Sequence, residues 1–469
     1  MGAIFDWVRV RNYRSIRDSG QLDLGPITLL VGRNNSGKSA LLRAIYLIQM
    51  GSRLSNDDFR IGADDLDVQL GLRDVSHLRL ATGETLTDGF IGGHLSYTAK
   101  RMLPDGFSMQ IKAVNVDGGE AEFNAIPQQE PQSLIFPVLT GRRPGSYQSQ
   151  VREDSSRTVL PTDDNLVGRV MELASDNVPE AAKFRDLSRR VLGVNFDVIN
   201  GANGQLIGVK IDRYQRILLE SMGSGLSGTL SLLVNLSVAD GNVVLVEEPE
   251  NDLHPAALKV LLSAIRESSD RNQFVISTHS SVVLTMLGSL PNTRVLHTVS
   301  DRALPPTSEY RKVGGTEERM HILRDLGYEL ADLGLGDGWL IFEESSAERI
   351  VRDFLIPMFA PALARLRTLA AMGISRVSPI MQDFREMLLF AHLDGPYRGR
   401  AWVLVDGDEV GRKTVEDLRR SFKGGMPRIS RRGTNRFSSA IIQSYLTSGL
   451  MRSSILKTNK IGGLRRRPC

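Results

Sequence analysis

The sequence has little cysteine and no long hydrophobic run. Cys469 is its single cysteine, so neither a disulfide framework nor a cysteine metal site can be built within the chain. No apolar stretch approaches the roughly 20 residues that cross a bilayer, and the opening MGAIFDWVRVRNYRSI lacks the apolar core of a signal peptide. Hydrophobic residues make up 41% and charged residues 24%, a globular composition. We expect a cytoplasmic protein with no membrane contact.

The charges are unevenly distributed along the chain. Fifteen Lys or Arg and two acidic residues lie from Gly411 to the end, whereas 43 basic and 52 acidic residues precede them. Clusters such as Arg431-Arg432 and Arg465–Arg467 suit contacts with a phosphate backbone. A solvated tail without a partner is the alternative. The basic end predicts DNA as a partner.

A glycine-rich turn that fits GxxxxGK[ST] follows an apolar strand pattern at 27–31 and precedes an amphipathic helix. Backbone N–H groups of such a turn form an anion cradle, where Lys38 reaches the β- and γ-phosphates and the Ser39 hydroxyl binds Mg²⁺. An ordinary strand-to-helix turn is the alternative, but both flanking elements favour a nucleoside triphosphate. The predicted ATP-binding residues of this Walker A motif are Gly32, Asn34, Asn35, Ser36, Gly37, Lys38 and Ser39.

A second apolar strand, NVVLVEE at 242–248, ends in two carboxylates. In nucleotide hydrolysis the first carboxylate of such a Walker B strand, here Glu247, holds Mg²⁺ through water, and the second, Glu248, polarises the attacking water. A further apolar strand at 273–278 delivers His279, which can contact the γ-phosphate or the lytic water. A structural histidine is the alternative to that role.

A Ser/Gly segment stands shortly before the Walker B strand and precedes an apolar helix. It contains Ser221 and Gly223 and resembles the signature motif of ABC-type ATPases, where a serine hydroxyl and glycine amides bind the γ-phosphate held by the opposite subunit. A Gly/Ser-rich turn is the alternative. The order Walker A, signature, Walker B and histidine is the ABC order.

A second group of carboxylates lies in the last third of the chain. The apolar strand at 339–342 ends at Glu343, and the strand at 401–405 ends at Asp406 and Asp408. Carboxylates at the ends of two neighbouring parallel strands form an oxygen-lined cage suited to one or two Mg²⁺ ions. Such a cage orients water and stabilises the leaving oxygen of a phosphodiester. Acids at a strand end by chance are the alternative.

Together the nucleotide motifs resemble the ABC-type ATPase heads of the RecF, chromosome-maintenance and break-repair group, and especially the OLD-family (overcoming lysogenization defect) and Gabija nucleases. The segments that carry the resemblance are VRVRNYRSI near the start and VEEPENDLHP at 246–255. It implies catalysis by Glu248, His279, Ser221 and Gly223, with the last two acting across a dimer. Glu247 stands where the general pattern has Asp, and His254 replaces the usual aspartate of the inter-subunit loop. Gln49 is only a candidate for the Q-loop glutamine.

The acidic cage resembles the Toprim domain that follows the ATPase in OLD-family nucleases. The resemblance assigns Glu343 to the first strand and Asp406 and Asp408 to the DxD pair, with Mg²⁺ or Mn²⁺ as the metal. Glu344 replaces the usual glycine, and the catalytic lysine is not placed, Lys413 and Lys423 being candidates. A degenerate Toprim domain that only binds DNA or a partner nuclease is the alternative.

The fold class that follows is α/β: an ABC-type P-loop NTPase head with a β-rich and helical insertion, followed by a Toprim-like α/β domain. The expected boundaries are 1–300 for the ATPase domain with an insertion at 51–204, 301–335 for a linker, 336–425 for the Toprim-like domain and 426–469 for the basic tail. A homodimer or higher oligomer joined through ATP-sandwiched heads is expected.

Two functions compete. One is an ATP-hydrolysing ATPase coupled to a metal-dependent DNA endonuclease, with defence against phage or plasmid DNA, or DNA repair, as the role that the resemblance implies. The other is a non-nucleolytic ATPase sensor or scaffold that controls a separate effector protein. A transporter ATPase fits less well because the long insertion and the appended acidic block have no use there.

Overall fold

The chain divides into two compact units, Met1–Glu329 and Leu330–Cys469. The computed structural model describes residues 4–50, 54–76, 78, 85–102, 106–123, 126–139, 157–161, 164–175, 178–201, 204–212, 215–222, 226–251, 253–301, 303–314, 318–319, 321–322, 338–390, 401–406, 408–421 and 428–431. Among these residues no helix is long and apolar enough to cross a membrane. Most of the basic tail and of the expected linker lies outside the described residues.

The first unit is built on a six-stranded sheet with the order β16-β15-β4-β14-β13-β9. All neighbouring strands are parallel except β15 and β16. Strands β4, β13 and β14 are buried along their whole length, which explains their continuous Val, Ile and Leu content. The strands are β4 (Ile27–Val31), β9 (Ile135–Val138), β13 (Val243–Glu247), β14 (Gln273–Thr278), β15 (Thr293–Ser300) and β16 (Ser308–Lys312).

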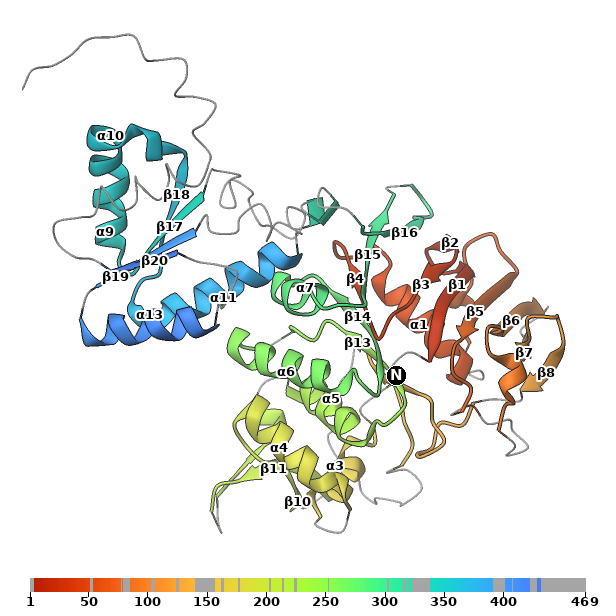
Figure 1. The fold of residues 1–469 in the computed structure, drawn as a ribbon. Helices are drawn as coiled ribbons and strands as arrows, with labels where there is room; N and C mark the ends of the chain where they lie inside the picture. Colours follow the sequence, from red (N-terminus) through yellow and green to blue (C-terminus); the bar gives the residue numbers. More distant parts are fainter. Residues whose placement is uncertain are drawn as a thin grey trace, which may run out of the picture. The chain divides into compact units, whose positions relative to one another are not determined.

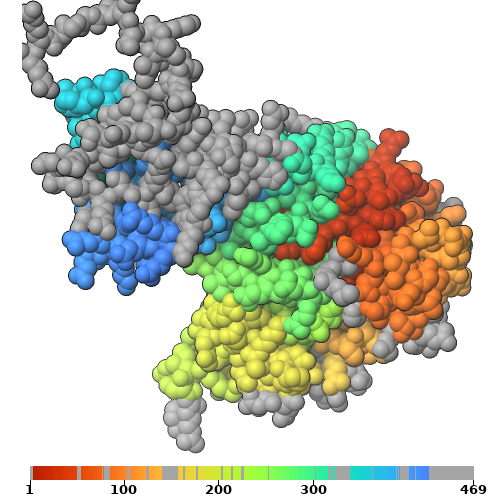
Figure 2. All heavy atoms as spheres, in the orientation of Figure 1, coloured from red at the N-terminus to blue at the C-terminus, as the bar shows by residue number. Residues whose placement is uncertain are grey.

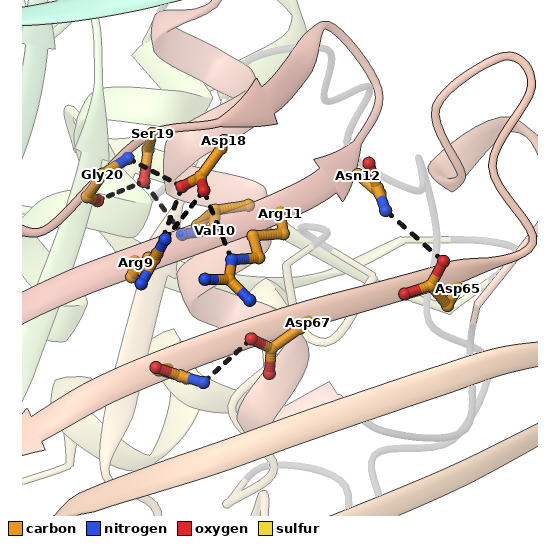
Figure 3. A network of polar contacts seen from close by, with 10 residues as sticks. Arg9, Val10, Arg11, Asn12, Asp18, Ser19, Gly20, Asp65 and Asp67 are labelled. Carbon is orange, nitrogen blue, oxygen red and sulfur yellow. Dashed lines mark hydrogen bonds and ion pairs between the residues drawn. The ribbon is translucent and has the colours of Figure 1, made fainter.

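A second, antiparallel sheet has the order β2-β1-β5-β6-β7-β8, with β3 also paired to β1. Figure 2 shows its segments, red to orange, side by side on the surface of this unit. Its exposed face carries a network of Arg, Asp and Asn side chains (Figure 3). The strands are β1 (Phe5–Tyr13), β2 (Ile16–Asp18), β3 (Leu22–Asp23), β5 (Asp65–Leu72), β6 (His94–Met102), β7 (Gly106–Val114) and β8 (Glu120–Phe123).

Helix α1 (Lys38–Met50) lies between the two sheets and shares one core with both (Figure 1). Helices α5, α6 and α7 lie on the other face of the six-stranded sheet, and α3 and α4 pack beside α5. The helices are α3 (Leu166–Ala174), α4 (Glu180–Leu192), α5 (Leu226–Val238), α6 (Pro255–Ser268) and α7 (Ser281–Gly288), with 3-10 turns η1 (Asn56–Asp58), η2 (Asp88–Phe90) and η3 (Leu219–Ser221).

The segment 51–204, predicted to be a β-rich and helical insertion, contributes strands to both sheets. Its strand β5 pairs with β1, and its strand β9 pairs with the Walker B strand β13 inside the six-stranded sheet. Both sheets therefore depend on this segment. A small antiparallel sheet, β10 (Asp197–Gly201), β11 (Gly204–Lys210) and β12 (Arg216–Leu218), runs from the end of this segment into η3.

The second unit contains a four-stranded parallel sheet with the order β18-β17-β19-β20. Leu340 and Phe342 of β17 pack with Trp402 and Leu404 of β19 on one face, and Trp339 meets Phe384 edge-on on the other. The elements are β17 (Gly338–Phe342), α9 (Ser345–Ile350), the π-helical η4 (Val351–Leu355), α10 (Ile356–Phe359), η5 (Pro361–Arg365), β18 (Leu366–Ala370), α11 (Ile374–Phe390), β19 (Ala401–Val405), α13 (Glu409–Ser421) and β20 (Arg428–Arg431).

Candidate nucleotide and metal sites

The Walker A turn joins β4 to α1 and requires its two glycines. Gly37 has φ +105°, and a Cβ there would lie 2.1 Å from Ser308 Oγ. A Cβ on Gly32 would lie 2.2 Å from the Thr298 carbonyl oxygen. Both neighbours belong to the β15–β16 hairpin, which Figure 2 shows against the N-terminal segment. The hairpin therefore packs directly on the turn, and only glycine allows this approach.

Lys38 is held inside the turn. Its Nζ donates hydrogen bonds to the carbonyl oxygens of Gly32, at 2.9 Å, and Arg33, at 3.0 Å. The side chain is 4% exposed, and burial lowers the pKa of its ammonium, whereas Glu248, Glu250 and Glu247 act in the opposite direction.

The remaining predicted phosphate-binding residues differ in exposure. Asn34 and Asn35 are exposed at the tip of the turn, and Ser39 is half-buried in the first turn of α1. Ser36 is 4% exposed, and its Oγ accepts or donates no hydrogen bond within the described residues. A buried hydroxyl without a protein partner suits a site that receives phosphate oxygens.

The two Walker B carboxylates have different surroundings. Glu247 ends β13 as a buried residue, with Arg43 Nη2 3.8 Å from its Oε2. Glu248 has φ +49°, and its backbone N–H donates to the Ser277 carbonyl oxygen at 2.9 Å. Its side chain is 23% exposed and accepts a hydrogen bond from Asn251 Nδ2 at 3.0 Å. The turn therefore directs Glu248 out of the strand toward solvent, as a residue that activates water needs.

His279 follows β14, the strand that lies between the Walker A and Walker B strands. Its Nδ1 lies 3.5 Å from Glu248 Oε1 and 3.3 Å from Glu250 Oε1. Because β4, β13 and β14 are parallel, their carboxyl ends meet at one edge of the sheet, and Lys38, Glu248 and His279 all lie at that edge. The sequence-predicted residues of the three strands are brought together.

The signature-like segment is described only in part. Ser221 is an exposed residue at the end of η3, and α5 begins at Leu226. Gly223 lies outside the described residues. Ser221 thus stands exposed just before a buried helix, and its action across a dimer stays a prediction.

A cavity of about 470 Å³ adjoins the Walker A turn. Ser15, in the β1–β2 turn, lines this cavity and also hydrogen-bonds to Ser308 Oγ at 2.8 Å, beside Gly37. The other lining residues are Arg14, Asn56, Asp57, Phe59, Ile61, Gly62, Arg101, Pro305 and Pro306. Within this lining, Arg14 is paired with Asp58, and Arg101 lies over the Phe59 ring, which stacks on Phe107.

Several residues have roles that sequence reasoning missed or misread. Tyr310 is nearly buried, and its hydroxyl donates to the Gly37 carbonyl oxygen at 2.8 Å. Gln49, the Q-loop candidate, instead bonds to the backbone of Leu134 and Ile135 at the start of β9, which makes it a structural residue. His254 caps α6 by accepting the Ala256 N–H at 3.2 Å. No pattern in the sequence predicts that the side-chain amide of Gln49 bonds to strand β9.

The predicted acidic cage lies at the carboxyl ends of β17 and β19. Glu343 Oε2 accepts the backbone N–H of Asp406 at 2.9 Å, so these two residues are adjacent. Asp408 Oδ1 accepts the N–H of Gly411 at 2.7 Å in the first turn of α13. Within the described residues no group of three or more His, Cys, Asp or Glu side chains is arranged to hold a metal ion. The cage stays a prediction.

Solved structures with a similar chain course are heads of SMC proteins. An Smc head bound to the C-winged helix domain of ScpA is 15% identical with a TM-score of 0.45, over 66% of this chain and 98% of that chain. The SMC head domain from Thermotoga maritima is 12% identical with a TM-score of 0.38, over 66% and 100%. An Smc head domain with an extended coiled coil, bound to the C-terminal domain of ScpA from Pyrococcus furiosus, is 13% identical with a TM-score of 0.43, over 69% and 99%.

Two family models match parts of the first unit. The family described as "AAA domain, putative AbiEii toxin, Type IV TA system" matches residues 135–285, and the family described as "AAA ATPase domain" matches residues 6–81. No curated protein matches the chain. The two matched segments contain the Walker A turn, the Walker B strand and His279. The first unit is therefore similar to ATPase domains of the AAA type.

Proposed function

We propose that the first unit hydrolyses ATP and that its hydrolysis controls DNA cleavage by the second unit. Lys38 and the Walker A amides bind the phosphates, and Ser39 and Glu247 supply the oxygen ligands that Mg²⁺ prefers. A Mg²⁺ ion held there would neutralise phosphate charge. Glu248 takes the proton of the attacking water, and His279 contacts the γ-phosphate or that water.

The observation that carries the ATPase proposal is the meeting of Lys38, Glu248 and His279 at one sheet edge. Glu248 leaves the strand with a positive φ and lies 3.5 Å from the His279 ring nitrogen. A carboxylate beside a hydrogen-bonding ring and opposite a phosphate-binding lysine has the groups that in-line attack of water requires. Ser221 is proposed to complete the site across a homodimer.

The nuclease proposal rests on the second unit. Glu343 and Asp406 adjoin at the carboxyl ends of the neighbouring parallel strands β17 and β19, which supports a Toprim-like domain. Glu343, Asp406 and Asp408 are the proposed ligands of Mg²⁺ or Mn²⁺. The basic end of the chain is the proposed DNA contact, and defence against phage or plasmid DNA, or DNA repair, is the proposed role.

Two assays on the full chain test the proposal. Phosphate release from ATP with Mg²⁺ tests the ATPase, and nicking of supercoiled plasmid with Mg²⁺ or Mn²⁺, with and without ATP, tests the nuclease. We expect both activities. Phosphate release without nicking under any metal and nucleotide condition would leave the ATPase standing and remove the nuclease.

A non-nucleolytic ATPase that controls a separate effector is the second candidate. It is favoured by the use of Asp408 at the start of α13 and by Glu344, which adds a carboxylate beside Glu343. A like charge next to a metal ligand raises the cost of approach by a DNA phosphate. In this case plasmid binding without nicking is the expected result.

A further inference from the structure

Glu250 is a largely buried carboxylate beside the proposed catalytic residues, two positions after Glu248. Its side chain is 9% exposed. Oε1 accepts three hydrogen bonds, from Thr278 Oγ1 at 2.7 Å, from the backbone N–H of His279 at 2.8 Å and from the backbone N–H of Ser280 at 3.0 Å. All three donors belong to the segment that carries the histidine.

The contacts of Glu250 are concentrated on one short segment. The same Oε1 lies 3.3 Å from His279 Nδ1, so main chain and ring of the histidine both face this carboxylate. Oε2 is buried and accepts no hydrogen bond from the described residues. A buried carboxylate is costly unless it is well bonded, and hydrogen bonds to a charged acceptor are stronger than neutral ones. Glu250 thus ties the turn after β13 to the segment after β14.

We propose that Glu250 is a positioning residue that fixes the histidine segment, Thr278 to Ser280, against the Walker B turn. The proposal rests on the ATPase function proposed above and adds a residue to it. Glu248 and His279 come from different strands, and β13 and β14 are joined through α6, more than twenty residues of chain. The two strands pair directly up to Glu247 and Ser277. Beyond that pair, the Glu250 side chain bonds the turn after β13 to residues 278–280, so the catalytic carboxylate and the histidine keep one relative position.

The role predicts a difference between two substitutions of Glu250. Glu250→Gln keeps an oxygen that accepts the three donors but removes the charge, whereas Glu250→Ala removes both. Positioning by hydrogen bonds therefore predicts that Gln retains most of the function that Ala loses. A residue that acted as the general base would lose its function equally with either change.

The first experiment measures hydrogen–deuterium exchange and does not depend on hydrolysis. The amides of His279 and Ser280 donate to Glu250, so in Glu250→Ala they should exchange at least about tenfold faster, and in Glu250→Gln close to the wild-type rate. Amides of β4 report global stability and should not change. Glu267→Gln on α6, a carboxylate whose side chain is 62% exposed, is the matched control. Unchanged exchange at 279 and 280 in Glu250→Ala would overturn the proposal.

The second experiment measures kcat and KM for ATP in wild type, Glu250→Ala, His279→Ala and the double variant. By analogy with outer-shell partners at metal sites, we expect Glu250→Ala to lower kcat by about 10–100-fold with KM within about threefold. The double variant should be no slower than His279→Ala, because Glu250 acts through that histidine segment. Additive losses would overturn the proposal. An inactive wild type would refute the proposed ATPase function, while the exchange experiment would still decide the role of Glu250.

Discussion

The two units place carboxylates at the carboxyl ends of parallel strands, but they hold them differently. At the nucleotide edge of the first unit, Glu250 is bonded to three donors and Lys38 to two carbonyl oxygens. In the second unit, among the described residues, the Glu343 side chain accepts the backbone N–H of Asp406. In the first arrangement several hydrogen bonds converge on each charged group, whereas in the second one side-chain bond joins the ends of β17 and β19.

This difference indicates how much each site depends on its ligand. Buried, multiply bonded charges are arranged before a substrate arrives, which is what electrostatic stabilisation of a reaction requires. Neighbouring carboxylates repel one another until a cation neutralises them. We therefore expect the nucleotide site to tolerate little change, and the acidic edge of the second unit to depend on metal.

The largest expected effect is at Lys38. Lys38→Ala should weaken ATP binding by at least about 100-fold, because it removes a charge that makes strong hydrogen bonds to phosphate oxygens. Titration calorimetry with ATP and Mg²⁺ measures the loss, and circular dichroism checks the fold. Lys112→Ala, at a solvent-facing lysine of β7 that pairs with Glu120, is the control. Wild-type affinity in Lys38→Ala would refute the Walker A assignment.

The next effect concerns Glu248. Glu248→Gln should keep ATP binding and lower turnover by about 10²–10⁴-fold, the usual loss when a general base is removed. It should also accumulate an ATP-bound dimer, visible by sedimentation. Turnover at the wild-type rate would mean that the base lies elsewhere, with Glu247 and Glu250 as the next candidates.

The third prediction tests the separation of the two units. Asp406→Ala combined with Asp408→Ala should abolish metal-dependent plasmid nicking. Phosphate release from ATP should stay within about twofold of wild type, because substitutions at one of two independent sites do not alter the other. The control pair is Asp417→Ala and Glu416→Ala on α13. Loss of ATP hydrolysis in the Asp406 and Asp408 variant would show that the two sites are coupled.

The fourth prediction concerns the inter-subunit role of Ser221. Ser221→Arg should block ATP-dependent association because a bulky cation would fill the space that the opposite subunit's γ-phosphate needs. Light scattering with and without ATP measures it, and Ser269→Arg, at the end of α6, is the control for an added surface charge. Association equal to wild type would refute the role and leave the Walker residues unaffected.

Local motifs made the nucleotide edge predictable from the sequence. The spacing of residues within Gly32–Ser39 predicts the strand-to-helix turn, and the carboxylates Glu247 and Glu248 mark the end of the strand β13. The topology was harder. Ile135–Val138 is a four-residue strand that contains Pro137, and its place beside β13 depends on Gln49, which lies 86 residues away along the chain. Contacts of that separation leave no local pattern, which is why segment 51–204 was expected to be an insertion.

Glu250 shows a second limit of sequence reasoning. From its position in the turn after β13, the sequence predicts only that Glu250 is an alternative candidate for the general base. Its hydrogen bonds, however, are with residues 278–280 at the end of β14, the neighbouring strand of the sheet. The same limit applies to Tyr310, whose hydroxyl reaches the Walker A turn from β16. Residues that act on another strand's turn become visible only when the strand order is known.

The smallest expected effect tests whether several hydrogen bonds to a charged side chain stabilise the fold when that side chain is not buried. Asp18 accepts hydrogen bonds from Arg9 and the Gly20 N–H and lies near Arg11, but its side chain is 41% exposed (Figure 3). The hydrogen bond from Arg9 is the main reason that the pKa of Asp18 falls from 3.8 to about 2. Exposed ion pairs contribute only about 0–1 kcal/mol because water screens them.

Asp18→Asn should therefore lower the free energy of unfolding at pH 7 by less than about 1 kcal/mol. Because the folded pKa lies below the unfolded value, the stabilisation by Asp18 is complete above pH 3.8 and is lost as the pH falls toward 2. The gap between wild type and variant in urea unfolding should narrow over that range. Asp117→Asn, in the β7–β8 turn, is the control. A loss of several kcal/mol at pH 7 would mean that bond number outweighs burial, and the contrast between the two units would then need another explanation.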